Sequence, residues 1–145
     1  MYKISHIFLI IILGIISILD IKNKRVPVYI LIIMAVTGII FVCIGGEFDI
    51  EKILIAMLPG IILIMISIVS KQQIGYGDDL LILIMGIYMD IDDIISIVLS
   101  AFFMSSVVAV ILMTVFKKKK DFEMAFSPFL LMGYGLVKGV YFICG

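Results

Sequence analysis

Two aspartates beside apolar stretches are the residues of this chain best placed to do chemistry. Asp20 directly follows the apolar run from Ile7 to Leu19. Asp78 ends the stretch Gly75-Tyr76-Gly77-Asp78, which precedes another apolar run. A carboxylate at the edge of a hydrocarbon-length segment is costly to keep unless it has a partner or a task. The two acids are therefore candidates for a functional pair.

Two carboxylates that lie close together cannot both ionise freely, so one pKa rises while the other stays low. The ionised acid can draw a proton from a water molecule, and the protonated acid can polarise a peptide carbonyl. This is the arrangement of an aspartic protease, in which the titration belongs to the pair rather than to either acid.

Each acid also has a structural interpretation. Pro27 disfavours a helical conformation at Val26, so the first helix is expected to end near Lys24 or Arg25, with Asp20 about one turn inside it. Asp20 would then be spaced for a favourable i,i+4 ion pair with Lys24.

The second acid has a rival. Two glycines one residue apart permit a close approach of another chain segment, and Asp78 falls at the expected start of the fourth helix. It would there be a good N-cap in a favourable dipole. Asp79 is a candidate for either role, and the local sequence leaves that choice open.

The segments that carry these acids are predicted to be membrane helices. The chain has 145 residues, of which 64% are hydrophobic. About 20 apolar residues cross a hydrocarbon layer of about 30 Å. The sequence predicts one all-α polytopic membrane domain over residues 1–145, with six transmembrane helices at about 4–22, 27–45, 51–70, 79–90, 93–116 and 124–144. The fourth is short, which suggests that the loop before it already dips into the membrane.

Charges in the links predict the orientation, because basic links stay on the cytoplasmic side. Alternate links carry opposite charges. The basic residues are Lys22, Lys24, Arg25, Lys71 and Lys117 to Lys120, and the acidic ones are Glu47, Asp49, Glu51, Asp90, Asp92 and Asp93. We therefore expect both termini outside the cell, and Asp20 and Asp78 at the cytoplasmic face.

The composition and the residue spacing do not indicate a nucleic acid, a metal or an organic cofactor as a partner. Eleven basic and eleven acidic residues give no net charge, so no nucleic-acid partner is expected. Cys43, Cys144 and His6 each stand alone, without the spacing of a metal or redox site. The sequence therefore predicts no metal and no organic cofactor.

Three stretches of the chain resemble the type IV prepilin peptidase family, including its short members that lack the methyltransferase region. The first is Asp20-Ile-Lys-Asn-Lys-Arg-Val-Pro27, an aspartate ending a span before a basic link and a proline. The second is Gly75-Tyr-Gly-Asp78, similar to the family's Gly-x-Gly-Asp motif. The third is Phe126-Ser-Pro-Phe-Leu-Leu-Met-Gly133, similar to the Pro-Phe-x-x-x-Gly stretch that opens the last span.

The resemblance implies a membrane aspartic endopeptidase that removes basic leaders from single-span, prepilin-like proteins at the cytoplasmic face of the inner membrane. Asp20 and Asp78 would be its catalytic pair, and Gly75, Gly77 and Asp79 would lie against the substrate. Its oligomeric state is left open.

The chain departs from the family at two positions. Leu80 stands where the family often has a lysine, and Val28 replaces an asparagine. The cysteine-rich loop and methyltransferase segment of longer members are absent as well, so no N-methylation is expected.

Two other classes of protein remain as alternatives. The paired acids would also suit a small ion-coupled or proton-coupled transporter or channel component, although an ion path would place them nearer mid-membrane. A presenilin-type protease shares Gly-x-Gly-Asp but usually pairs it with a Tyr-Asp motif, whereas Leu19 precedes Asp20 here.

Overall fold

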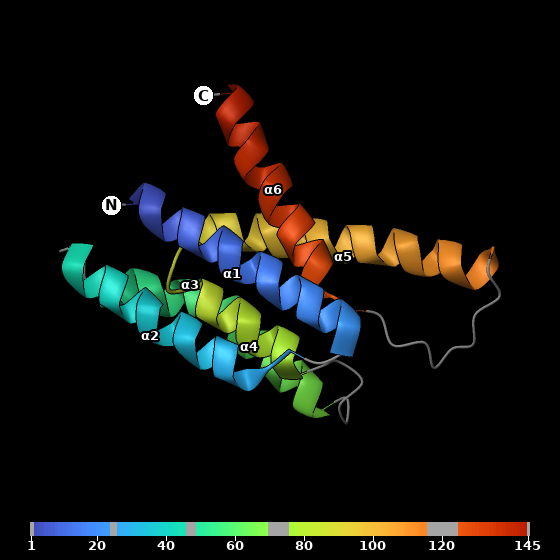
Figure 1. Ribbon diagram of the computed structural model, residues 1–145, viewed down its shortest axis with the longest axis horizontal. Helices are drawn as coiled ribbons and strands as arrows, with labels where there is room; N and C mark the ends of the chain where they lie inside the picture. The colour runs from blue at the N-terminus through green and yellow to red at the C-terminus, as the bar shows by residue number, and fades with distance from the viewer. Residues whose placement is uncertain (1, 24–25, 46–48, 70–75, 116–124, 145) are drawn as a thin grey trace.

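A computed structural model describes residues 2–23, 26–45, 49–69, 76–115 and 125–144 of the chain (Figure 1). These residues form six α-helices, and no strand occurs among them. The helices are α1 (Tyr2–Asn23), α2 (Val28–Gly45), α3 (Ile50–Val69), α4 (Tyr76–Met85), α5 (Ile91–Thr114) and α6 (Ser127–Cys144). The all-α prediction is confirmed, and all but α4 lie within three residues of their predicted bounds.

Helix α4 differs most from its prediction, which was residues 79–90. It begins earlier, at Tyr76, because Asp78 and Asp79 favour the first turn of a helix, where the dipole attracts negative charge. It ends earlier because the chain tightens after Met85: the N–H groups of Gly86, Ile87 and Tyr88 each bond to the carbonyl three residues back.

The helical period sorts the residues of α1 onto two faces. Leu9, Leu13 and Ile16 are fully buried in the bundle, while Ile11 and Ile18 on the other side are more than half exposed. A helix that is apolar on both faces suits an apolar surrounding rather than water. Asp20 lies four residues after Ile16, so the period of 3.6 residues places it on the buried face.

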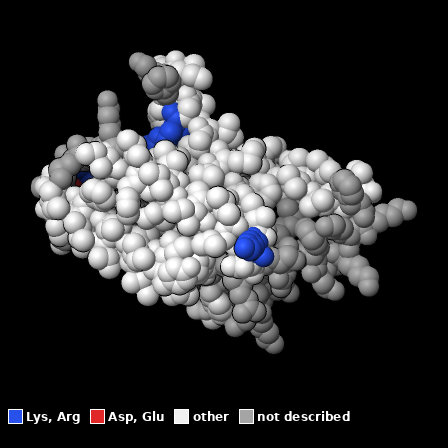
Figure 2. Space-filling view, viewed as in Figure 1, with Lys and Arg blue, Asp and Glu red and all other residues white. Residues whose placement is uncertain are grey.

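The outside of the molecule is largely apolar. Isolated charged side chains interrupt the face seen in Figure 2, which is otherwise mostly uncharged. Within the described part of the chain, four helices are long and apolar enough to cross a membrane: residues 4–23, 28–45, 50–69 and 91–114. Length and composition therefore indicate a membrane protein. The ten residues of α4 measure about 15 Å, half the thickness of the hydrocarbon layer.

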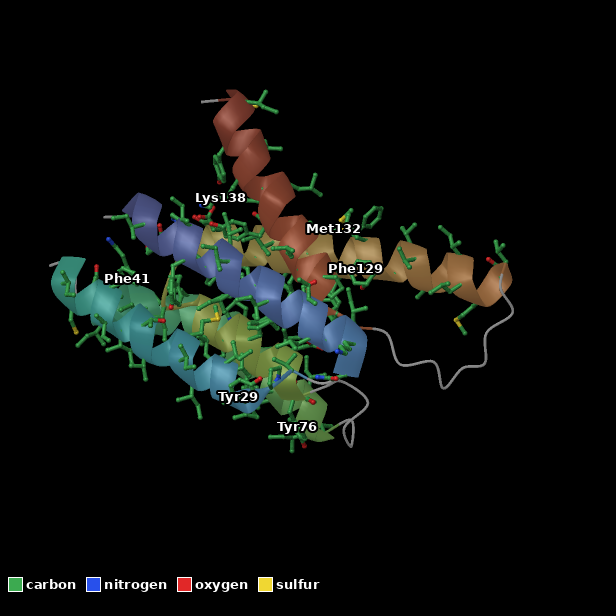
Figure 3. The ribbon with its side chains drawn as sticks, in the orientation of Figure 1. Tyr29, Phe41, Tyr76, Phe129, Met132 and Lys138 are labelled. Carbon is green, nitrogen blue, oxygen red and sulfur yellow. The ribbon has the colours of Figure 1, made fainter. Side chains whose placement is uncertain are left out.

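Consecutive helices from α1 to α5 run in alternate directions (Figure 1). One end of the bundle therefore holds the C-terminal end of α1 and the N-terminal ends of α2 and α4. Tyr29 and Tyr76 lie at this end and Phe41 at the other (Figure 3). Helix α6 begins beside the C-terminal half of α1, packs on α1 and α5, and then leaves the bundle at a steep angle.

Glycines allow two pairs of helices to approach closely. A Cβ atom at Gly60 of α3 would lie 2.5 Å from the Leu83 Cα atom of α4. A Cβ atom at Gly133 of α6 would lie 2.8 Å from the Ile97 carbonyl oxygen of α5. Since backbone atoms are the obstacles, neither contact can be relieved by a rotating side chain. These contacts hold α4 and the start of α6 in place.

We expect Gly60→Ala to lower the free energy of unfolding by about 1–3 kcal/mol, because the added methyl group pushes α3 away from α4. Gly135→Ala is the matched control, since a Cβ atom there meets nothing within 4 Å. Loss of helical circular dichroism on heating in detergent measures both variants. Equal melting temperatures for the two would contradict the assigned backbone contact.

Candidate active site

Asp20 is buried near the C-terminal end of α1. Only 4% of its surface is exposed, and its Oδ2 atom accepts a hydrogen bond from the Ser127 backbone N–H at 3.2 Å. A buried carboxylate without such a partner would be strongly unfavourable. The alternative partner considered above, Lys24, lies outside the described residues.

Asp78 lies in the first turn of α4 and is only partly buried. Its Oδ1 atom accepts a hydrogen bond from the Ser127 hydroxyl group at 3.1 Å. The two acids are thus brought to one residue from distant parts of the chain, since Ser127 is 107 positions from Asp20 and 49 from Asp78. If Asp78 served only as a helix cap, this contact with another helix would be unexplained.

The surroundings of Asp78 disfavour its charged form. Burial is the main cause and the nearby Asp20 carboxylate the second, and together they raise the pKa of Asp78 from 3.8 to about 7. The hydrogen bond from Ser127 acts in the opposite direction. Asp78 lies outside the four apolar spans, at the end of the bundle. It can therefore carry a proton at neutral pH, which a general acid requires.

Asp79 occupies a different environment from Asp78. Its side chain is 1% exposed, and Ser67 of α3 donates a hydrogen bond to it. Its Oδ2 atom has no hydrogen-bond partner among the described residues. Successive residues of a helix point about 100° apart, so Asp78 contacts Ser127 while Asp79 contacts α3. As packed here, Asp79 is closed to a lysine of an incoming peptide, and its role in substrate binding stays a prediction.

Gly77 brings the two acidic motifs together. A Cβ atom on Gly77 would lie 2.7 Å from the Cβ atom of Val26, in the link that follows Asp20. Only a glycine lets the start of α4 approach that link so closely. Gly75, the other glycine predicted to contact substrate, lies outside the described residues.

Ser127 was not identified as a site residue from the sequence. The only local signal is Ser127-Pro128, a pair typical of a helix start, because proline favours the first turn. This signal locates the beginning of α6, but it does not identify the carboxylates that the serine meets.

A cavity of about 470 Å³ lies at the other end of the bundle, lined in part by His6, Asp49 and Tyr88. His6 and Asp20 are separated by about 21 Å along α1, so the cavity is not part of the acidic site. The Nδ1 atom of His6 is 3.0 Å from the Tyr134 hydroxyl group, a hydrogen bond that gives this lone histidine a structural partner. Across the described ranges, no group of three or more His, Cys, Asp or Glu residues is arranged to hold a metal ion.

Long apolar helices and two carboxyl groups joined through one serine define the class: a helical membrane protein with a paired-acid site. The sequence matches the type IV leader peptidase family over residues 7–114, which is more than half of the chain, so the chain belongs to that family. The matched stretch includes Asp20 and Asp78 and ends before Ser127. Comparisons with curated proteins and with solved structures gave no match. Family membership identifies a leader-peptidase-like protease.

We expect Gly77→Ala to lower the free energy of unfolding by about 1–3 kcal/mol, because the new methyl group collides with Val26. Val26→Gly removes the Cβ atom that it would meet. The double variant should therefore lose less stability than the sum of the two single variants. Thermal melting of the four proteins in detergent measures this coupling, and strictly additive losses would show that the contact does not set the position of α4.

Proposed function

We propose that this chain is an aspartic endopeptidase that removes the basic leader of single-span, prepilin-like proteins at the cytoplasmic face of the membrane. The observation that carries the proposal is the meeting of Asp20 and Asp78 at Ser127. Membership of the leader peptidase family supports the peptidase activity. The arrangement of the two acids supports the aspartic mechanism.

The reaction needs one proton shared by the two acids. The ionised acid takes a proton from water, and the oxygen of that water attacks the scissile carbonyl carbon. The protonated acid gives its proton to the carbonyl oxygen, which forms a neutral gem-diol. The C–N bond then breaks as the amide nitrogen receives the first acid's proton, and a diol hydroxyl returns a proton to the second acid.

The burial of the site defines the side from which a substrate can approach. Asp20 and Ser127 are buried, while Asp78 is partly exposed. The scissile peptide and the attacking water therefore reach the pair from the side of Asp78. A basic leader suits this approach, because an acidic site attracts positive charge.

The position of the pair in the bundle favours a peptidase over an ion path. Asp20 is near the last turn of α1, Asp78 is in the first turn of α4 and Ser127 begins α6. All three lie at helix ends, whereas an ion-coupled transporter places its site near the middle of the membrane. We propose that this end is cytoplasmic and that six membrane segments leave both termini outside, with the short helix α4 held within the bundle by α2, α3 and α5.

Asp20→Asn and Asp78→Asn should each reduce leader cleavage by more than about 100-fold, because each removes a general acid or base. Asparagine keeps an oxygen that accepts the bond from Ser127, so the fold is retained. Co-expression with a type IV prepilin, followed by gel analysis of its leader, measures the loss. Asp79→Asn is the control and should keep cleaving. Inactive Asp79→Asn beside active Asp78→Asn would refute the chosen pair.

Cleavage should decline as the pH rises through about 7. The pKa of Asp78 is raised to about 7, so the carboxyl group holds its proton below that pH and loses it above. Since the mechanism consumes that proton, kcat/KM should fall about tenfold per pH unit on the alkaline side. A pH profile of purified protein on a leader peptide tests this. Constant kcat/KM between roughly pH 6 and 9 would contradict a protonated acid in the mechanism.

A further inference from the structure

Ser127 is the residue through which α1, α4 and α6 meet, and it is fully buried. It lies beyond the stretch that matches the leader peptidase family. It also precedes the Pro-Phe pair of the third motif, so neither the family match nor the motif assigns it a role.

The Ser127 N–H group is free to reach Asp20 because of its place in α6. The Phe126 carbonyl accepts the first bonds of the helix, from the N–H groups of Phe129 and Leu130. The N–H group of Ser127 therefore belongs to the helix start, where N–H groups have no acceptor within the helix. Pro128 follows with no N–H group, and its ring restrains the backbone at the helix start. The donor is thus held by the backbone and directed at Asp20.

The two donors of Ser127 differ in which protonation state of the carboxyl group they can bond to. A backbone N–H only donates, so it favours an unprotonated oxygen on Asp20. The positive end of the α6 dipole acts in the same direction. A hydroxyl group both donates and accepts. It can donate to an ionised Asp78 and, after rotation, accept from a protonated one.

We propose that Ser127 is a positioning residue that holds Asp20 and Asp78 together, with its backbone N–H group on the acid that acts as the base and its hydroxyl group on the acid that carries the shared proton. This inference rests on the proposed function and assigns the two roles that it left open. Asp20 is the base that takes the proton from water, and Asp78 is the acid that protonates the carbonyl oxygen. The raised pKa of Asp78 agrees with its assignment as the acid.

Ser127→Ala tests the proposal because it removes the hydroxyl group and keeps the N–H group. The ionised form of Asp78 loses a stabilising donor, so the pH at which Asp78 ionises should rise by about one unit. The alkaline limb of the kcat/KM profile should move to higher pH with it, while the acid limb stays in place. We expect kcat to fall about 10- to 100-fold with little change in KM, because the two acids are less well aligned.

Ser100→Ala is the matched control. Its hydroxyl group bonds to the Ile97 carbonyl of its own helix, 2.8 Å away, so its loss should leave both limbs of the profile unchanged. Ser127→Thr keeps a hydroxyl group and should restore the wild-type profile. A merely structural role for Ser127 would lower activity at every pH without moving either limb.

A measurement that needs no substrate separates this proposal from the proposed function. Infrared difference spectroscopy follows the C=O band of a protonated carboxyl group as the pH rises, and Asp78→Asn identifies the band of Asp78. A higher ionisation pH in Ser127→Ala supports the role of Ser127, even if the wild-type chain cleaves no prepilin. An unchanged ionisation pH overturns it, even if the chain is an active peptidase. A band that disappears in Asp20→Asn instead of Asp78→Asn also overturns it, because the proton would then sit on Asp20.

Discussion

The hydrogen bond between the Ser127 N–H group and Asp20 is the interaction on which the site depends. A carboxylate that is 4% exposed must be satisfied inside the protein. The first helix supplies the charge and the last helix supplies the donor, so the need to satisfy Asp20 fixes where α6 begins. That position in turn places the Ser127 hydroxyl group against Asp78.

Close backbone contacts supply the second constraint, because they decide where α4 begins and how it lies. Gly77 allows the link after Asp20 to touch the start of α4, and Gly60 allows α3 to touch the last turn of α4. Asp78 and Asp79 are then separated by the helical twist alone. One faces Ser127, and the other is buried against Ser67. The glycines therefore act on the chemistry indirectly, through the placement of a helix.

The sequence predicts much of this architecture, because apolar length and helix-ending residues are local signals. Five helices lie close to their predicted bounds, and Asp20 and Asp78 both bond to Ser127. The different surroundings of Asp78 and Asp79 could not be predicted from the sequence, because both acids fit the start of a helix equally well. Ser127 was missed for a similar reason. A Ser-Pro pair opens many helices, and only the position of α6 beside α1 and the start of α4 gives this serine two carboxylates.

The shortness of α4 connects the fold with the chemistry. Hydrolysis of a peptide bond needs water, and the first turn of α4, with Tyr76, lies at one end of the bundle (Figure 3). A helix of about 15 Å that begins at this end stops within the bundle, while its polar first turn meets the start of α6. Backbone that is irregular at such a depth is tolerated only where protein or water surrounds it. The first turn of this short helix therefore brings Asp78 and its partner Ser127 to one end of an otherwise apolar bundle.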